Sequence, residues 1–407
     1  MTETVNDDRF AFDPMDASKT KDFSLLASIR SECPVVRPAE GVVYTSLWED
    51  TDEVFRGWKK YSSVGDMRAP GVRVPIEESF LGEIDAPLHP RIRRLLLQGF
   101  TLKAANEAEA WTRTNVRRRM LPIAEKGAGD FMATLAIPLP GSVAAHELGI
   151  PDELHDQVMD WCNELLHSTW PAQGATERGV GIANAFPEFA AVLDELIAER
   201  RDGTRADATD LLAIMVRNED EDGWRLPEQH VRTLAINILA GSLSSSYMIG
   251  NLLYRYVTDV EGFARVIEAD RSLIPAAVEE SLRLESPVSF LFRTALDDGE
   301  IGGCPIAKGE HLMMGIASAN RDDLLFPEGG EFRLDRNNTR KHLAFGAGPH
   351  LCLGNHLTRM VGKVILEETL DLFPPGSLHL TPGYEWKCVA HPLEYGPESV
   401  DVLIAKD

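Results

Sequence analysis

A single cysteine in a glycine-rich loop constrains this chain more than any other feature. The loop reads Phe345-Gly346-Ala347-Gly348-Pro349-His350-Leu351-Cys352-Leu353-Gly354, and an apolar helical pattern over 357–373 follows it. Glycines let the backbone turn sharply and bring N–H groups toward the sulfur. Such hydrogen bonds stabilise a thiolate, and so does the positive end of a helix that begins beside the cysteine. The pattern predicts a loop that presents one thiolate to a large, flat metal centre.

Two other roles for Cys352 are open on spacing alone. A free cysteine is commonly a buried structural residue, although that role does not need three glycines around it. A zinc ion could take His350, Cys352 and His356, but the sequence has no Cys-x-x-Cys pair to supply further ligands. Metal ligation by a lone thiolate is the favoured interpretation.

Composition limits the class of protein. The chain has 407 residues, is 44% hydrophobic and carries a net charge of -23. The hydrophobic content is sufficient for a large core. The negative net charge disfavours nucleic acid and anionic membranes as partners. Residues 1–9 are polar and acidic, so we expect neither a signal peptide nor a membrane anchor. Five scattered cysteines indicate reduced thiols, and we predict a cytoplasmic monomer.

The segment Thr233–Tyr254 contains 22 residues without a charge. That length could span a bilayer, but the segment also carries two glycines, two asparagines and four serines. A helix buried through the middle of a large protein fits this composition better.

The remaining pattern is predominantly helical. Periodicity extends from His89 to about Glu285, whereas 35–47 read as a β-hairpin and 50–61 as a helix. Short strand-like runs recur near the C-terminal end, at 300–306, 311–316 and 400–404. No linker or composition shift appears, so we predict one domain over 1–407.

The cysteine loop resembles the haem-binding signature of the cytochrome P450 family, Phe-Gly-x-Gly-x-His-x-Cys-x-Gly, at every fixed position. The resemblance implies a mainly α fold with a minor β region, and a long central helix across the haem. It implies that Cys352 ligates the iron of haem b, with Phe345, Gly346 and Gly354 forming the loop around it.

Glu280 and Arg283 lie three residues apart on a predicted helix, and could therefore pair. Such a pair is ordinarily solvated and weak. The stretch resembles the Glu-x-x-Arg element of the family, which implies a structural role on the side of the haem loop. Glu331 stands where the family has a basic partner, so Arg333 or Arg336 could take its place.

The two haem carboxylates require cations or hydrogen-bond donors. His89 and Arg93 lie one helical turn apart, although a basic surface helix would also explain them. The resemblance implies that His89, Arg93, Arg293 and His350 bind the carboxylates.

The predicted central helix departs from the family pattern. In the family, an acid and an alcohol in this helix deliver protons for O–O cleavage. This chain reads Ala240-Gly241-Ser242-Leu243-Ser244-Ser245, which places Leu243 at the position of the acid and Ser244 at that of the alcohol. Leucine cannot move a proton, whereas serine can hydrogen-bond as threonine does. Gly241 and the serines can distort the helix and make room for dioxygen.

Three interpretations follow. Water held by Ser244 and Ser245, or a substrate hydroxyl, delivers the protons to a normal monooxygenase. Alternatively, the enzyme uses hydrogen peroxide, or the chain is a non-catalytic haem-thiolate binding or sensing protein. We favour the first.

The resemblance also implies partners and a substrate pocket. Electrons would come from NAD(P)H through a separate ferredoxin or flavodoxin and a reductase, and the substrate would be a hydrophobic small molecule. Basic residues such as Arg113 and Lys363 could form a docking face, or could simply be solvated. The predicted pocket residues are Ile76, Phe80, Leu239, Ala240, Leu243, Val288 and Phe290.

Overall fold

The computed structural model describes residues 8–65, 74–169, 175–176, 179–180 and 182–405. Contacts between Cα atoms divide the chain into two compact units built from interleaved segments. Unit 1 comprises Met1–Ser62, Glu109–Ile137 and Ser244–Asp407, and unit 2 comprises Ser63–Ala108 and Pro138–Leu243. The single domain expected over residues 1–407 stays a prediction. Within the described ranges, no helix is both long and apolar enough to span a membrane.

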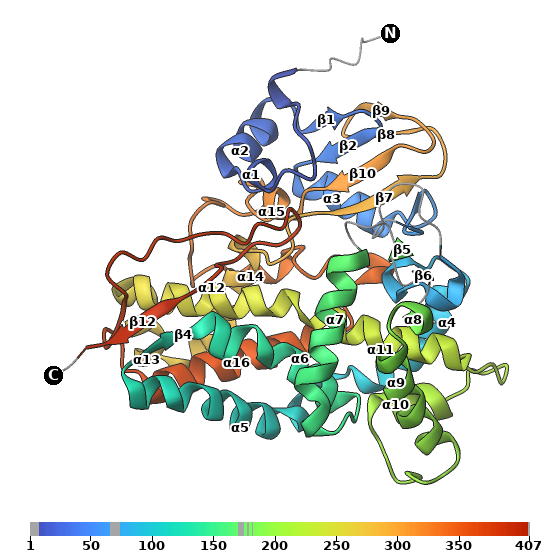
Figure 1. Cartoon of the computed structure of the whole chain (residues 1–407). Helices are drawn as coiled ribbons and strands as arrows, with labels where there is room; N and C mark the ends of the chain where they lie inside the picture. Colours follow the sequence, from blue (N-terminus) through green and yellow to red (C-terminus); the bar gives the residue numbers. More distant parts are fainter. Residues whose placement is uncertain (1–7, 66–73, 170–174, 177–178, 181, 406–407) are drawn as a thin grey trace. The chain divides into compact units, whose positions relative to one another are not determined.

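Unit 1 contains a five-stranded sheet in the order β1-β2-β10-β7-β3 (Figure 1). Strands β1 and β2 form the predicted hairpin, β10 runs parallel to β2, and β7 runs antiparallel to both β10 and β3. Valine and tyrosine side chains of the hairpin are buried against the core, which fits their preference for a pleated, half-buried surface. The strand bounds are β1 Val35–Ala39, β2 Val42–Thr45, β3 Tyr61–Ser62, β7 Leu291–Ala295 and β10 His311–Met314.

Helices make up most of the rest of unit 1. An added Cβ at Gly362 of α16 would lie 2.9 Å from Val278 Cγ1 of α14 and 3.5 Å from Met248 Cε of α12, so these three helices pack closely there. Helix α5 begins in unit 2 and continues into unit 1. The helix bounds are α1 Ala17–Thr20, α2 Phe23–Glu32, α3 Trp48–Arg56, α5 Leu102–Lys126, α12 Ser244–Thr258, α13 Arg265–Ala269, α14 Ile274–Leu284, α15 Ile316–Ala319 and α16 Asn355–Leu372. The small sheets contain β4 Ala128–Asp130, β8 Gly299–Ile301, β9 Cys304–Ile306, β11 Leu378–Leu380 and β12 Asp401–Ile404.

Among its described residues, unit 2 is mainly helical, with one short hairpin and an isolated bridge between Glu219 and Arg225. Its buried Arg200 on α9 donates two hydrogen bonds of 2.7 Å to Asp210, whose carboxylate also caps α10. This pair ties consecutive helices together inside the unit. The bounds are α4 Leu88–Leu96, α6 Pro138–Glu147, α7 His155–Thr169, β5 Ala175–Thr176, β6 Gly179–Val180, α8 Ile182–Ala185, α9 Pro187–Arg201, α10 Leu211–Arg217 and α11 Glu228–Ser242.

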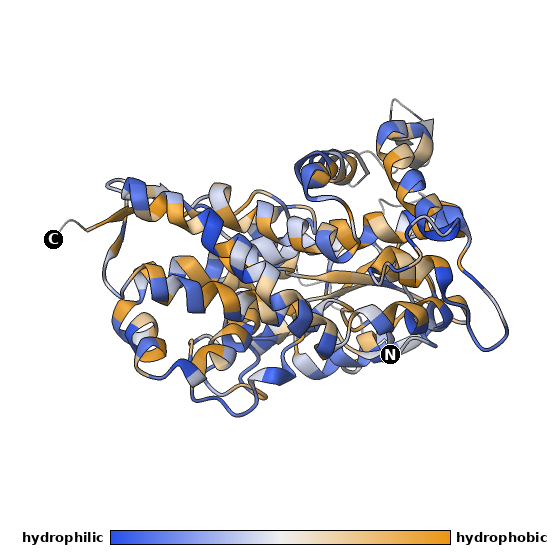
Figure 2. Cartoon of the chain, turned by 90° about the horizontal axis from the view of Figure 1, so that it is seen from below, coloured by the Kyte–Doolittle hydropathy of each residue, from blue (hydrophilic) through white to orange (hydrophobic). Residues whose placement is uncertain are grey.

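The mainly α fold with a minor β region is confirmed, and Figure 2 shows hydrophilic and hydrophobic residues alternating along most helices. Two predicted helices have different bounds. The helix expected over 50–61 is α3, which begins at Trp48 and ends before Gly57. Asp322 Oδ2 accepts the Trp48 N–H at 2.9 Å, so a residue far along the chain satisfies the first helical donor. The helix expected over 233–254 is assigned as α11 and α12 with Leu243 between them, although Leu243 keeps helical angles of φ −63 and ψ −35.

Candidate functional site

The cysteine loop lies in unit 1, contains the short 3-10 helix η10 (Gly348–His350) and ends where α16 begins. Gly346 and Gly348 both have a φ of 65°, a region that strongly favours glycine. A Cβ at Gly348 would also lie 2.8 Å from the backbone oxygen of Phe55 on α3. These glycines are therefore required by a close turn against α3.

The sulfur lies at the N-terminal end of α16. Cys352 N–H donates to Phe345 O at 2.9 Å, which closes the loop on itself. Gly354 is the N-cap of α16, and a Cβ there would lie 3.9 Å from Cys352 Sγ. The helix dipole at this end favours a negatively charged sulfur.

The donor set fits a metal centre that takes one thiolate from the protein. Cys352 is only partly buried, whereas burial raises the pKa of Cys162 to about 12 and keeps that thiol protonated. No cluster of three or more His, Cys, Asp and Glu side chains that could hold a metal ion occurs among the described residues. The zinc alternative for Cys352 therefore loses its support, whereas a haem needs only the single sulfur and space beside it.

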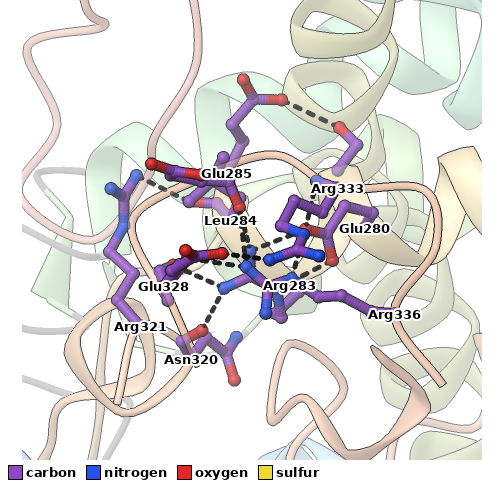
Figure 3. A network of polar contacts seen from close by, with 12 residues as sticks. Glu280, Arg283, Leu284, Glu285, Asn320, Arg321, Glu328, Arg333 and Arg336 are labelled. Carbon is purple, nitrogen blue, oxygen red and sulfur yellow. Dashed lines mark hydrogen bonds and ion pairs between the residues drawn. The ribbon is translucent and has the colours of Figure 1, made fainter. Parts of the chain in front are cut away.

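Glu280 and Arg283 form a buried ion pair, which confirms the predicted pairing (Figure 3). Both side chains are 0% exposed, and Arg283 Nε and Nη2 donate to the carboxylate at 2.8 and 2.7 Å. The remaining donors reach backbone oxygens of Asn320, Gly329 and Glu331 at 2.7, 2.7 and 2.8 Å. The alternative of a solvated surface pair is wrong here.

Arg336 is the third member of this network. Its side chain is buried, and its Nε donates to Glu280 Oε1 at 2.9 Å. Arg336 is one of the two arginines predicted to replace the basic partner that the family has at the position of Glu331. Arg333 also contacts Glu280, but through its backbone N–H at 2.9 Å. The network fixes the irregular segment 320–336 against α14.

The candidate ligands of the haem carboxylates occupy both units. In unit 1, Arg293 is buried on β7 and donates to Phe292 O at 2.7 Å, and His350 is partly buried in η10. In unit 2, His89 is buried and Arg93 partly buried on α4, one turn apart as expected. Whether the four share one ligand stays a prediction.

The sequence that departs from the family pattern is divided between the two units. Leu239 is buried on α11, and Leu243 N–H donates to Ala240 O at 3.2 Å. An added Cβ at Gly241 would meet no atom of the described chain within 4 Å. A single methyl group could therefore be added at this position without a clash with the described chain.

Ser244 and Ser245 open α12 in unit 1. Ser245 Oγ lies 3.4 Å from Thr358 Oγ1 of α16, so its hydroxyl faces the helix that follows Cys352. The part of either serine in proton delivery stays a prediction.

The predicted pocket residues differ in burial. Phe290 is buried in a core cluster of unit 1, and Val288 is partly buried. In unit 2, Phe80 is buried whereas Ile76 is 42% exposed. Their contact with a substrate stays a prediction.

Acidic side chains neutralise most of the basic residues that could have formed a docking face. Arg113 contacts Glu109, Glu367 and Glu368, and Lys363 contacts Glu109 at 3.1 Å. In unit 2, the Arg91 guanidinium pairs with Asp220 and stacks 4.7 Å above the Trp224 ring. These cations are held inside the protein's own ion pairs.

Sequence reasoning missed a second group of polar residues behind the cysteine loop. Glu279 precedes Glu280 on α14 and pairs with Arg359 of α16 and with His342. Glu279 and Glu280 are adjacent in the chain but contact different partners. In the sequence, the available signal was a second glutamate directly before the Glu-x-x-Arg element.

The fold and the cysteine loop define a haem-thiolate protein, and comparison with known proteins identifies its family. A cytochrome P450 family model matches residues 175–380. Cytochrome P450 monooxygenase PikC of Streptomyces venezuelae is 31% identical over 74% of this chain and 70% of its own length. The steroid C26-monooxygenase of Mycobacterium tuberculosis (strain CDC 1551 / Oshkosh) is 29% identical over 85% of this chain and 90% of its own. The solved cytochrome P450 CYP109Q5 of Chondromyces apiculatus has a TM-score of 0.85 at 26% identity, covering 98% of this chain and 99% of that one.

This chain belongs to the cytochrome P450 family. It is a P450 monooxygenase that binds haem b, in agreement with relatives named as monooxygenases and hydroxylases. The peroxide-dependent and non-catalytic alternatives are not favoured.

Proposed function

We propose that Cys352 is the thiolate ligand of the haem iron and that the enzyme inserts one oxygen atom from dioxygen into a hydrophobic small molecule. The cysteine loop carries this proposal: Cys352 is only partly buried and lies at the N-terminal end of α16, in a turn that requires its glycines. When bound, haem supplies the oxygen-activating chemistry, to which a thiolate ligand contributes electron density.

His89, Arg93, Arg293 and His350 are the proposed partners of the haem carboxylates. Arginine and histidine side chains suit carboxylates because charge-assisted hydrogen bonds are the stronger class. Phe345, Gly346 and Gly354 would shape the protein surface against the haem. This assignment rests on the match to the family sequence.

We propose that the electrons come from NAD(P)H through a separate ferredoxin or flavodoxin and its reductase. Arg340 and Lys341 support a docking role, because both are exposed and close in sequence to the cysteine loop. Leu351, directly before Cys352, is 40% exposed. An acidic redox partner would find both charge and an apolar contact in unit 1.

Protons would pass through water held by Ser244, with Ser245 as a secondary donor and Gly241 leaving room for dioxygen. Leu243 blocks the usual acid route because its side chain has no proton to give. Leu243→Asp should raise the ratio of hydroxylated product to NADH consumed if the missing acid limits turnover. An unchanged ratio would mean that another route supplies the protons.

The pocket proposed from Ile76, Phe80, Leu239, Ala240, Leu243, Val288 and Phe290 is apolar. Solved relatives suggest probes: one was determined with testosterone and another, a P450 EryK variant, with erythromycin B. Titrating the haem-loaded enzyme with such compounds and following the haem absorption spectrum would find ligands.

Reconstitution with ferredoxin, reductase and NADH then tests the proposed monooxygenase function. We expect a hydroxylated product. The proposed function would be contradicted if, with each ligand that the titration identifies, all the electrons were released as hydrogen peroxide. A cytoplasmic location and a monomeric state belong to the same proposal.

A further inference from the structure

A single buried carboxylate connects α14 to the region of the cysteine loop. Glu279 is 4% exposed, and Arg359 Nε and Nη2 donate to its two oxygens at 2.5 and 3.2 Å. His342 Nε2 lies 3.0 Å from Glu279 Oε2, and both side chains are almost fully buried. These contacts are internal to unit 1.

The first branch runs through His342 to the start of the loop. Ala344 N–H donates to His342 Nδ1 at 3.2 Å, so Nδ1 is the acceptor and Nε2 carries the proton given to Glu279. Burial lowers the pKa of His342, which favours this neutral tautomer. Ala344 directly precedes Phe345, the first residue of the loop.

The second branch runs through Arg359 to the end of the loop. Arg359 Nη1 donates to Asn355 Oδ1 at 2.7 Å, and Asn355 Nδ2 donates to Cys352 O at 2.7 Å. The Arg359 guanidinium also lies 4.5 Å from the centre of the Phe345 ring. The carbonyl of the cysteine itself is therefore the last acceptor of this chain of hydrogen bonds.

We propose that Glu279 is a positioning residue that holds both ends of the cysteine loop, and thereby sets the orientation and reduction potential of the thiolate–haem centre. This inference rests on the proposed role of Cys352 as the iron ligand. Residues that orient a metal ligand from behind change metal affinity or activity by about 10- to 100-fold when they are lost.

The carboxylate is suited to this role because it stays charged. Hydrogen bonds from His342 and Arg359, together with the positive charge of Arg359, outweigh the burial of Glu279 and lower its pKa to about 2. Glutamine at this position keeps the shape but loses the charge that balances Arg359, so both branches are weakened together. Arg359→Met breaks only the second branch.

The test compares haem-loaded, full-length variants. In dilute urea, the reduced carbon monoxide complex of Glu279→Gln should lose its thiolate-type, red-shifted absorption roughly tenfold faster than the wild type. Arg359→Met should show a smaller acceleration, and both variants should shift the reduction potential of the haem iron. Glu279→Asp keeps the charge, so its rate of spectral loss should lie between those of the wild type and Glu279→Gln. If Glu279→Gln does not load haem, Glu279→Asp is measured in its place.

Glu368→Gln is the matched control. Glu368 is another buried glutamate of unit 1, 2% exposed, and it pairs with Arg113 at 2.9 Å on the far part of α16 from the loop. This variant should lose stability without changing the reduction potential or the rate of spectral loss. Equal effects in Glu279→Gln and Glu368→Gln, or no effect in either, would overturn the inference. Failure of the underlying function looks different: the wild-type spectrum would then persist in Cys352→Ala.

Discussion

Replacing Arg283 by methionine should be among the most destabilising single changes in this protein. The guanidinium is 0% exposed and donates five hydrogen bonds, two to Glu280 and three to backbone oxygens. Breaking a buried ion pair by removing one partner costs about 3–5 kcal/mol. Each backbone oxygen left without its donor adds about 1 kcal/mol or more. Because Arg336 still pairs with Glu280, we expect a total loss of about 5 kcal/mol.

A loss of that size approaches the whole stability of many domains, which is about 5–15 kcal/mol. Arg333→Ala is the matched control, since Arg333 contacts Glu280 through its backbone N–H, which alanine keeps. Its side chain is 39% exposed and pairs with the exposed Glu328 and Asp335, so its removal should cost far less stability than the removal of Arg283.

Urea unfolding of the haem-loaded variants, followed by circular dichroism, measures both changes. Arg283→Lys keeps the charge but has fewer hydrogen-bond donors, so its loss of unfolding free energy should be intermediate. It is measured in place of Arg283→Met if that variant does not accumulate. The reasoning is refuted if Arg333→Ala is as costly as Arg283→Met, or if Arg283→Met costs less than about 2 kcal/mol.

Two further predictions concern unit 2. Burial, helped by the charge of Glu107, raises the pKa of Glu147 to about 7, so the folded state favours the neutral acid and its stability contribution is lost as the pH rises through about 7. The loss begins above the ordinary glutamate pKa of 4.5. Glu147→Gln should therefore match the wild type at about pH 4 and be more stable than the wild type by about 2 kcal/mol at about pH 8, a figure reduced because the side chain still contacts water. Unfolding free energies with the same pH dependence in both proteins would contradict this. Gly149 has a φ of 72° and its Cβ would lie 2.3 Å from Asp210 Oδ2, so Gly149→Ala should cost about 3 kcal/mol in thermal or urea unfolding. Gly203→Ala, at a φ of 90° with no described atom within 4 Å of the added carbon, should cost only about 1 kcal/mol, and equal costs would show that the clash is irrelevant.

Local patterns predicted a large part of this molecule because the chemistry is concentrated in short stretches. The glycines around Cys352 reported the turn, and the spacing of Glu280 and Arg283 reported their pairing. Helix periodicity and the 35–47 hairpin gave the mainly α fold with its minor β region. In each case, neighbouring residues in the sequence carry the interaction.

The features that were not predicted depend on residues far apart in the chain. Arg113 looked like a surface cation until Glu367 and Glu368, from α16, were found beside it. Glu279 gave no sign that it reaches Arg359, 80 positions later. In Thr233–Tyr254, Gly241 and the serines indicated a local distortion, but the sequence did not show that the segment divides into two helices at Leu243.

The central claim is that the Cys352 thiolate ligates the haem iron. The reduced carbon monoxide complex tests it directly, since a thiolate ligand shifts its main absorption band to the red. We predict this band in the wild type and in Cys388→Ala, another partly buried cysteine, and its absence in Cys352→Ala. A red-shifted band that survives in Cys352→Ala would contradict the account.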